Sequence, residues 1–305
     1  MGRSQVFTPV ETKDGSCTFY SEAFGEWFHN KNGACNEAQT TYVDASELAG
    51  RAQADELRIL DVCYGLGYNT AAALETIWRV NAGCRVQVKG LEIDIEVARS
   101  AIAQNLVRQY SPQVQQVLQQ LADGQVVDWQ DASSTGGHSL SAQILLGDAR
   151  QTIQRLIEQN WQADVIFFDP FSPPHCPQLW TVEFLRLVAR CLEPGRGVLV
   201  TYSCAAAVRA AFGLAGFSIG SIHTGGRRWP GTIACLNDRD LPPLSAQERE
   251  HLQTRAAVPY CDPTLRGSAA EILEARSRVQ ATSELSPTKL WRQRWHEIND
   301  TDALY

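Results

Sequence analysis

Four acidic residues stand where short apolar runs of the sequence end. Asp61 follows "LRIL", Glu92 closes "VKGLE", Asp148 follows "ILLG" and Asp169 follows "VIFF". Runs of this length and composition are typical of buried strands, and a helical pattern follows each of them. The carboxyl ends of the strands in an open α/β sheet meet along one edge, where ligands bind. Carboxylates gathered there can accept hydrogen bonds from hydroxyl or amine groups, and one of them can remove a proton from a bound amine.

A loop with two glycines, Gly65 and Gly67, lies directly after Asp61 in the stretch "LDVCYGLGYNT". Glycine allows a tight turn and a close approach of ligand to backbone, and the following helix points free amide groups at that ligand. A dinucleotide-binding loop would carry a third glycine where Thr70 stands. Cys63 occupies the place of the first glycine in a methyltransferase loop of the form D/E-x-G-x-G-x-G. Two glycines alone are equally compatible with a purely structural turn.

Glu92 and Asp148 add carboxylates at the ends of the next two predicted strands. An acid at the position of Glu92 can accept hydrogen bonds from both hydroxyls of a ribose. Asp148 is placed to accept one from the exocyclic amine of adenine. Either residue alone could instead be the N-cap of the helix that follows it. Together with Asp61, Gly65 and Gly67, the pair resembles the S-adenosylmethionine site of class I methyltransferases.

The stretch "FFDPFSPPHCPQLW", residues 167–180, carries a more specific resemblance. It is similar to the strand-end motif D-[GAP]-F-[AS]-P…N-P-x-[ML]-W in the methyltransferase domain of MnmC, the tRNA 5-methylaminomethyl-2-thiouridine biosynthesis bifunctional protein. The loop "LDVCYGLGYN" resembles that family's G-x-G-x-N loop, and "LVTYSCAAAVRAAFGLAGFSI" and "GGRRW" resemble later family segments. The match runs from about residue 14 to residue 236 and consists of ordered, spaced motifs.

The resemblance implies a methyltransferase that uses S-adenosylmethionine and has tRNA as its partner. The methyl acceptor would be the amine of 5-aminomethyl-(2-thio)uridine at the wobble position. Asn69, which ends the family's glycine loop, would join the cofactor-binding residues. Asp169 would hold the substrate ammonium and accept its proton, because only the neutral amine has a lone pair for attack. The prolines behind Asp169 restrict the φ angles of the loop and so help to position the carboxylate.

Other residues at family positions are expected near the substrate. The aromatic residues would wall the pocket or border the target, one glutamate falls at an E-[ST] position of the family, and two arginines would contact phosphate. These residues are Glu37, Phe171, Trp180, Tyr202, Arg227 and Arg228. Tyr20 and Phe24 are candidates for stacking on the target base. Core packing is an equally good interpretation of the aromatic residues, and a solvated turn is one for the arginines. Glu22 and Glu26 are expected on the solvated surface.

The chain departs from the family at several positions. Pro170 stands where the bifunctional proteins usually carry glycine, and His175 and Cys176 replace a basic residue and an asparagine. No flavin-binding oxidase segment is visible after Asn237, so the chain resembles the stand-alone members of the family. Upstream uridine-modifying enzymes would then have to supply the aminomethyl group.

The elements that must hold these residues alternate along the chain. From residue 57 to about 236, strand-like runs alternate with helical patterns, which favours a doubly wound α/β sheet. With the resemblance, this predicts a Rossmann-like class I methyltransferase fold with a seven-stranded, mostly parallel sheet and an antiparallel hairpin at one end. We expect a β-rich N-terminal extension (1–50), the methyltransferase domain (51–240) and a helical C-terminal appendage (241–305). The Gln-rich stretch 111–139 is predicted to extend the second helix and then form an exposed insertion.

Composition narrows the classes of function. The 305 residues carry a net charge of −7, which argues against broad coating of nucleic acid but leaves local basic patches at 225–229 and 289–295. None of the nine cysteines lies in a pair or a Cys/His cluster with zinc spacing. We therefore expect no metal, and the reduced thiols of a cytoplasmic protein. No apolar run of about 18 residues indicates a membrane span.

Other functions fit parts of the sequence. The stretch "DPFSPP" is similar to the D-P-P-Y motif of methyltransferases that act on adenine or glutamine amines, but it lacks the second proline and the aromatic residue. Polyamine synthases share this fold and place an aspartate at the same strand end, but they use further acidic residues that are not found here. A methyltransferase acting on another amine, in a small molecule or a protein, is also possible. The altered glycine loop would also fit a non-catalytic Rossmann-like module that binds RNA or a partner.

Overall fold

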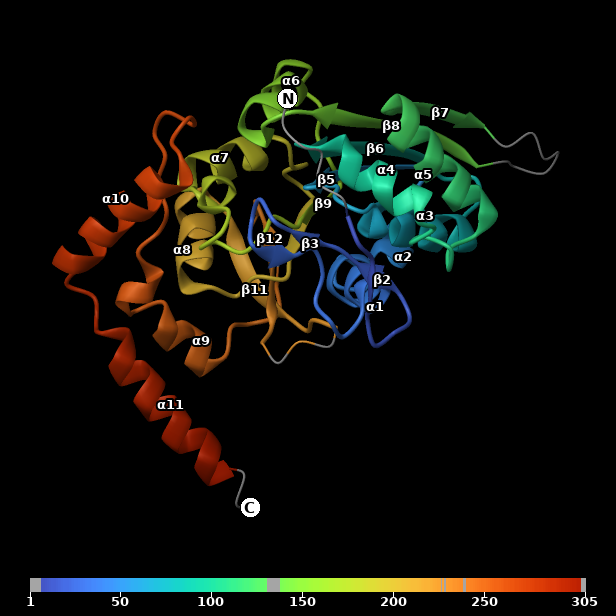
Figure 1. Ribbon diagram of the computed structural model, residues 1–305. Helices are drawn as coiled ribbons and strands as arrows, with labels where there is room; N and C mark the ends of the chain where they lie inside the picture. Colours follow the sequence, from blue (N-terminus) through green and yellow to red (C-terminus); the bar gives the residue numbers. More distant parts are fainter. Residues whose placement is uncertain (1–6, 131–137, 226, 228, 238–239, 303–305) are drawn as a thin grey trace.

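The centre of the computed structural model is a twisted sheet with helices on both faces (Figure 1). The structure describes residues 7–130, 138–225, 227, 229–237 and 240–302. Within them, eight strands follow the order β11-β12-β10-β9-β5-β6-β8-β7. Five neighbouring strands are parallel: β10 (Val198–Thr201), β9 (Val165–Phe168), β5 (Glu56–Val62), β6 (Arg85–Glu92) and β8 (Ser139–Leu146). Their carboxyl ends therefore share one edge of the sheet.

Antiparallel strands close the sheet on both sides. The predicted hairpin consists of β11 (Ser218–Ile222) and β12 (Gly231–Cys235), and β12 pairs with β10. On the opposite side β7 (Val126–Gln130) pairs with β8. The predicted α/β fold with a mostly parallel sheet is confirmed. The sheet has eight strands in the described part of the chain instead of the predicted seven, because β7 was not expected.

Helices cover both faces of the parallel strands. One face carries α3 (Tyr68–Val80), α4 (Ile95–Ala103) and α5 (Pro112–Gly124), and the other carries α6 (Ala149–Glu158), α7 (Val182–Arg190) and α8 (Ala206–Leu214). In β9, Val165 and Phe167 point into the first core, whereas Ile166 and Phe168 point into the second. Because both faces are buried, this strand reads as a continuous apolar run and not as an alternating pattern.

The segment 111–139 does not extend the second helix, α4, as predicted, and most of the predicted exposed insertion (131–139) falls on residues outside the described part. The segment forms α5 and then the edge strand β7, and residues 131–137 lie outside the described part. Pro112 begins α5, where its missing N–H costs no helical hydrogen bond. Apolar side chains recur at helical spacing among the glutamines and are buried against the sheet, namely Val114, Val117, Leu118, Leu121 and Ala122. The polar majority of the segment obscured this stripe.

The N-terminal segment is only partly β-structured. It begins with two short antiparallel pairs, formed by β1 (Val10–Glu11) with β2 (Cys17–Thr18) and by β3 (Tyr20–Ser21) with β4 (Glu26–Trp27). Helical turns follow, namely α1 (Ala34–Glu37), the π-helix η1 (Ala38–Asp44) and α2 (Leu48–Arg51). The prediction of short strands and turns missed these helices. Their buried residues Tyr42, Val43 and Leu48 belong to the first core, so packing on the sheet stabilises turns that are too short to be stable alone.

The C-terminal segment is mostly helical and packs beside α7 and α8 (Figure 1). It contains α9 (Ala246–His251), the short helix η3 (Arg255–Ala257), α10 (Ala269–Thr282) and α11 (Thr288–Asp302). Ser268 caps α10 in a reciprocal capping box with Glu271. In α11, Trp291 stacks on His251 of α9 at a centroid distance of 4.0 Å. The helix then extends away from the body of the molecule (Figure 1).

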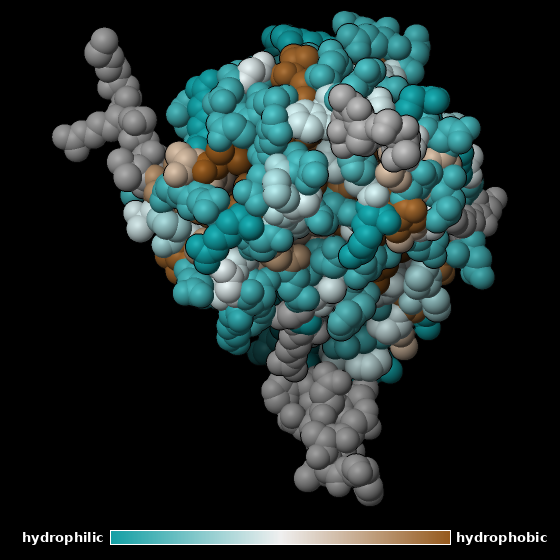
Figure 2. Space-filling view, turned by 90° about the vertical axis from the view of Figure 1, so that its right-hand side faces the viewer, coloured by the Kyte–Doolittle hydropathy of each residue, from teal (hydrophilic) through white to brown (hydrophobic). Residues whose placement is uncertain are grey.

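Figure 2 shows one face of the molecule, on which hydrophobic residues form small, separate groups among hydrophilic ones. Scattered groups of this kind are ordinary for a protein surface. Among the described residues, no helix combines the length and the apolar character that crossing a membrane requires.

Candidate active site

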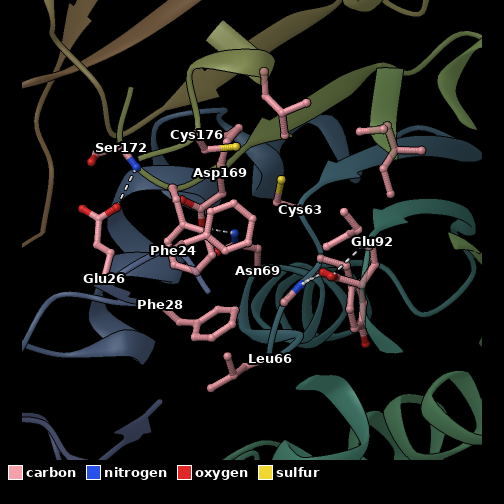
Figure 3. Close-up of a pocket in the computed structure, with 18 of the residues that line it drawn as sticks. Phe24, Glu26, Phe28, Cys63, Leu66, Asn69, Glu92, Asp169, Ser172 and Cys176 are labelled. Atoms are coloured by element: carbon pink, nitrogen blue, oxygen red, sulfur yellow. Dashed lines mark hydrogen bonds between the residues drawn. The ribbon is translucent and has the colours of Figure 1, made fainter. Parts of the chain in front are cut away.

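A cavity opens at the carboxyl edge of the parallel strands, and the N-terminal segment forms part of its wall (Figure 3). Nine residues predicted from the sequence line it: Phe24, Gly65, Asn69, Glu92, Asp148, Asp169, Phe171, Tyr202 and Arg227. Five other predicted residues do not line it: Tyr20, Asp61, Gly67, Glu37 and Trp180. Arg228 lies outside the described residues. The structure thus brings most of the predicted residues to one place.

The loop between β5 and α3 has the conformation that its glycines predict. Gly65 and Gly67 have φ angles of 57° and 85°, in the left-handed region. A side chain at position 67 would place its Cβ 2.8 Å from the hydroxyl oxygen of Tyr64. Cys63, which replaces a glycine of the methyltransferase loop, also has a positive φ of 68°. The cysteine therefore keeps the glycine-like turn, and both Cys63 and Cys176 line the cavity (Figure 3).

Glu92 holds the glycine loop from the neighbouring strand (Figure 3). One carboxylate oxygen accepts a hydrogen bond from the N–H of Gly65 at 2.8 Å. The other accepts from the N–H groups of Ile93 at 2.8 Å and Asp94 at 2.9 Å. Burial raises the pKa of Glu92, although these three donors act to lower it. A carboxylate offers about four acceptor positions, so about one remains for a ligand. Asp94, and not Glu92, is the N-cap of α4.

Asp148 serves two purposes that the sequence left as alternatives. It is the N-cap of α6, because its Oδ1 accepts a hydrogen bond from the N–H of Arg150 at 2.9 Å. It also lines the cavity, with 38% of its side chain exposed. The Arg150 guanidinium forms an ion pair with the same carboxylate, with 2.7 Å between Nη2 and Oδ2. Asp148 therefore faces the cavity in an orientation that its own helix holds.

Asp61 lies beneath the loop and does not reach the cavity. It is fully buried, and its Oδ2 accepts a hydrogen bond from the hydroxyl of Thr70 in α3 at 2.7 Å. No described residue donates to its other oxygen. Burial raises the pKa of Asp61 to about 7. Asp61 therefore ties the start of α3 to the end of β5 and positions the loop from below.

Asp169 directly follows β9 and lines the cavity (Figure 3). Its Oδ2 accepts a hydrogen bond from Nδ2 of Asn69 at 2.9 Å. Burial raises the pKa of Asp169 to about 8, and the charge of Glu37 adds to this, whereas Tyr42 and Asn69 act to lower it. A carboxyl group with this pKa exchanges its proton near neutral pH, which is what general acid–base catalysis requires.

Glu37 and Arg227 form an ion pair in which the arginine points inwards. Nη2 and Nε of Arg227 lie 2.5 and 2.6 Å from Oε1 of Glu37, whose side chain is 3% exposed. The guanidinium also lies over the ring of Tyr202, with 4.4 Å between Cζ and the ring centroid. Arg227 lines the cavity. An arginine predicted to contact phosphate is thus already paired with an anion inside the site.

Phenylalanines from two distant segments form an apolar wall of the cavity. Phe171 stacks on Phe24 with the ring centroids 4.6 Å apart and meets Phe28 edge-on at 4.9 Å. Beside them Glu26 accepts a hydrogen bond from the N–H of Ser172 at 2.9 Å. The prediction that Glu26 lies on the solvated surface is wrong, because it is half-buried and lines the cavity. The dense aromatic residues of "FGEWFH" were a signal for this wall.

The proline-rich loop after Asp169 is held from behind. Trp180 is fully buried, and its Nε1–H donates a hydrogen bond to the carbonyl of Phe171 at 2.8 Å. The hydroxyl of Tyr202 donates to the carbonyl of Pro170 at 2.9 Å. Trp180 therefore fixes the backbone of the loop and does not form the cavity wall that the sequence predicted for it. Its full burial corresponds to the core-packing alternative.

The cavity is built from carboxylates, one arginine, amides, thiols and aromatic rings. Within the described ranges, no group of three or more His, Cys, Asp and Glu side chains is arranged to hold a metal ion. All nine cysteines are free thiols. Such a set suits a polar organic ligand with hydroxyl and amine donors.

Comparisons with known proteins assign this site to a family. A model of S-adenosyl-L-methionine-dependent methyltransferases matches residues 102–237. The chain is 31% identical to an uncharacterized protein of Methanocaldococcus jannaschii over 274 residues, which make up 88% of this chain and 70% of that protein. It also superposes on the crystal structure of MNMC2 from Aquifex aeolicus with a TM-score of 0.75 and 32% identity, covering 91% of this chain and 85% of the other. The chain belongs to the MnmC-like family of S-adenosylmethionine-dependent methyltransferases.

The bifunctional relatives of this methyltransferase are much longer. The chain is 29% identical over 220 residues to the tRNA 5-methylaminomethyl-2-thiouridine biosynthesis bifunctional protein MnmC of Acidovorax sp.. The match covers 69% of this chain but 32% of that protein. The methyltransferase thus spans about a third of the length of the bifunctional proteins that it matches.

The cavity fits the cofactor of this family. Glu92 and Asp148 present carboxylates beside the glycine loop, as ribose hydroxyls and an adenine amine require. Gln178 adds a cavity-lining amide whose buried oxygen has no donor among the described residues. We propose that S-adenosylmethionine is held by Gly65, Asn69, Glu92 and Asp148, and that Asp61 and Gly67 shape the loop.

The position of Glu92 leads to a prediction for cofactor affinity. Replacing Glu92 with Ala removes the acceptor that remains for the ribose and also frees the loop amides. One charge-assisted hydrogen bond is worth about 1.5–3 kcal/mol, so the Kd for S-adenosylmethionine should rise roughly 10- to 150-fold in calorimetric titration. Glu158→Ala, at the exposed end of α6, is the control and should bind like the parent. Unchanged affinity in a folded Glu92→Ala variant would exclude Glu92 from the site.

The raised pKa of Asp169 leads to a prediction for stability. An aspartate that titrates at 3.8 when unfolded and at about 8 when folded binds fewer protons in the unfolded state between these values. The contribution of the protonated group to stability is fully present below about pH 4 and is lost as the pH rises through 8. We expect the thermal midpoint of Asp169→Asn to exceed that of the parent by an amount that grows from pH 5 to pH 9. A constant difference over this range would contradict the raised pKa.

Proposed function

We propose that this methyltransferase transfers a methyl group to the amine of 5-aminomethyl-(2-thio)uridine at the wobble position of tRNA. The observation that carries the proposal is the place of Asp169, a carboxyl group with a pKa of about 8 in a cavity that also holds the proposed cofactor residues. The relatives named for 5-methylaminomethyl-2-thiouridine biosynthesis support this substrate. Upstream uridine-modifying enzymes would supply the substrate, because the acceptor amine must already be present.

The residues around Asp169 suit methylation of an amine. S-adenosylmethionine supplies an electrophilic methyl group on its sulfonium. A primary alkyl amine is largely protonated near neutral pH, so a residue must remove a proton before its lone pair is free. Asn69 donates one hydrogen bond to Oδ2 of Asp169, and the acceptor positions that remain on the carboxylate can take a charge-assisted hydrogen bond from the ammonium and then its proton. An approaching cation favours the ionised carboxylate, so substrate binding lowers the pKa of Asp169 into its working range.

The aromatic wall suits a nucleobase. Phe24, Phe28 and Phe171 offer ring faces and edges on one side of the cavity. Stacking of a base on an aromatic side chain is worth about 1–3 kcal/mol, and single-stranded RNA is recognised mainly in this way. Trp27 also lines the cavity, and its ring meets Tyr20, which is 41% exposed, at 5.2 Å. A uridine of an unpaired anticodon loop could therefore enter the cavity while a neighbouring nucleotide meets the exposed ring of Tyr20.

The proposed base leads to a prediction for turnover. Asn is nearly isosteric with Asp but cannot take a proton. We expect Asp169→Asn to bind S-adenosylmethionine about as well as the parent and to lose roughly 10² to 10⁴-fold in turnover on aminomethyl-uridine tRNA. Raising the pH should recover part of the loss, because more of the substrate amine is then neutral. Methyl transfer would be followed by mass spectrometry of the isolated uridines.

A conservative variant at a distance controls this experiment. Asp128 is exposed on the edge strand β7, and Asp128→Asn should keep full turnover. A defect of Asp169→Asn that does not change with pH would indicate that the carboxylate only positions the amine. Full activity of Asp169→Asn at neutral pH would exclude a catalytic role. Methyl transfer to another amine but not to this tRNA would support the proposed reaction and reject the proposed substrate.

The inward position of Arg227 leads to a prediction for the pH profile. Arg227→Gln leaves Glu37 buried without its cation, and the unbalanced negative charge should raise the pKa of Asp169 further. We expect the rise of activity with pH to move up by about one pH unit. The double variant Glu37→Gln/Arg227→Gln removes both charges and should reverse this shift. If Arg227→Gln instead flattens the salt dependence of tRNA binding without moving the profile, Arg227 contacts phosphate.

A further inference from the structure

The C-terminal segment reaches the cavity through one arginine. The guanidinium of Arg150 lines the cavity and divides its donors between two sides. Nε and Nη2 donate to the carboxylate of Asp148, with 2.7 Å between Nη2 and Oδ2. Nη1 donates to Oδ2 of Asp262 at 3.0 Å and to the carbonyl of Gly267 at 2.9 Å. Asp262 and Gly267 lie in the C-terminal segment, just before α10.

Asp262 is buried and is fixed by several hydrogen bonds. Its side chain is 3% exposed, and the N–H of Gly267 donates to both of its oxygens at 3.1 Å. Thr264 donates its hydroxyl to the same carboxylate at 3.0 Å. The N–H of Asp262 donates to Glu183 of α7 at 2.7 Å. Although burial opposes ionisation, the hydrogen bonds from Gly267, Thr264 and Arg150 lower the pKa of Asp262. Asp262 is thus a buried carboxylate that binds the guanidinium of Arg150.

The donors of Arg150 leave little freedom for Asp148. A guanidinium is planar and its five N–H groups point in fixed directions, so fixing one edge also fixes the other. The Arg150 side chain is 11% exposed, and water can do little to replace a lost partner. Asp148 is 38% exposed, and besides its capping bond from the N–H of Arg150 it is held by this guanidinium. Its orientation toward the cavity therefore depends partly on Asp262, more than a hundred positions away in the sequence, which fixes this guanidinium.

We infer that Asp262 is a positioning residue for the cofactor, acting through Arg150 on Asp148, so that the C-terminal segment is a working part of the cofactor site. The inference rests on the role proposed for Asp148, which is to accept a hydrogen bond from the adenine amine. It adds a function to a segment that lies outside the residues matched by the family model.

The chain contains a matched control for this inference. A second buried arginine, Arg209 of α8, also ties the C-terminal segment to the sheet. Its Nη1 lies 2.7 Å from Oε1 of Glu248 in α9, and its other donors bind Thr232 and the carbonyl of Gly231. None of these residues lines the cavity. Loss of either ion pair should loosen the segment, but only the pair of Asp262 with Arg150 includes a residue that lines the cavity.

The test compares Asp262→Asn with Glu248→Gln in calorimetric titrations. The probes are S-adenosylhomocysteine and its hypoxanthine analogue, S-inosylhomocysteine, in which an oxygen acceptor replaces the amine that Asp148 would bind. The parent should prefer the adenosyl form. Asp262→Asn should weaken binding of that form roughly tenfold, within the range for coupled neighbouring residues, and should lose most of the preference. Glu248→Gln should keep both the affinity and the preference, even if its thermal midpoint falls as far.

A double-variant cycle completes the test. In an Asp148→Asn background, Asp262→Asn should have no further effect on the affinity, because the residue through which it acts is absent. A persistent effect there, or an equal loss in Glu248→Gln, would overturn the inference. If Asp262→Asn does not fold, Arg150→Lys keeps the charge but cannot divide its donors, and it should show the same loss of preference. A parent that binds both forms equally would reject the role of Asp148 itself, whereas a parent that prefers the adenosyl form beside an unaffected Asp262→Asn would reject only the inference.

Discussion

The burial of several carboxyl groups at one edge of the sheet is the constraint on which the rest of the site depends. Parallel strands bring these groups together because their carboxyl ends meet there, and burial disfavours the charged form of Asp61, Glu92 and Asp169. Burial raises the pKa of Asp61 to about 7 and that of Asp169 to about 8. Each carboxylate has a different kind of donor: a hydroxyl from Thr70 for Asp61, backbone amides for Glu92, a guanidinium from Arg150 for Asp148 and a side-chain amide from Asn69 for Asp169. The different hydrogen-bond donors therefore distinguish carboxyl groups that the sheet places at equivalent strand ends.

The sheet supplies only part of the cavity, and the two ends of the chain complete it. The N-terminal segment contributes Phe24 and Phe28 to the aromatic wall and places Glu37 against Arg227. The C-terminal segment places Asp262 behind Arg150. Arg227 itself follows the hairpin strand β11. Segments outside the parallel sheet thus contribute charge to the site, and the ion pairs of Glu37 with Arg227 and of Asp262 with Arg150 connect them to the cavity.

Much of this arrangement could be predicted from the sequence, because strand ends are local signals. Each carboxylate follows an apolar run, and the topology rule then brings them to one edge, as Glu92, Asp148 and Asp169 show. The sequence could not show which way a side chain points. Asp61 and Trp180 turn into the core, and Arg227 turns inwards because Glu37, 190 positions away, neutralises it. Distant partners leave no periodic pattern, and for the same reason the buried stripe of α5 was hidden by its glutamines.

The burial of Cys63 and Cys176 beside the cavity has a chemical consequence. A site that binds a methyl donor must not be methylated itself, and thiolates are the strongest nucleophiles among protein side chains. Cys63 and Cys176 both line the cavity, yet burial raises the pKa of Cys63 well above its usual value and that of Cys176 to about 12. Burial thus disfavours the reactive thiolate of both cysteines, whereas the raised pKa of Asp169 lies near neutral pH. Burial therefore favours the neutral form of the carboxyl group and of both neighbouring thiols.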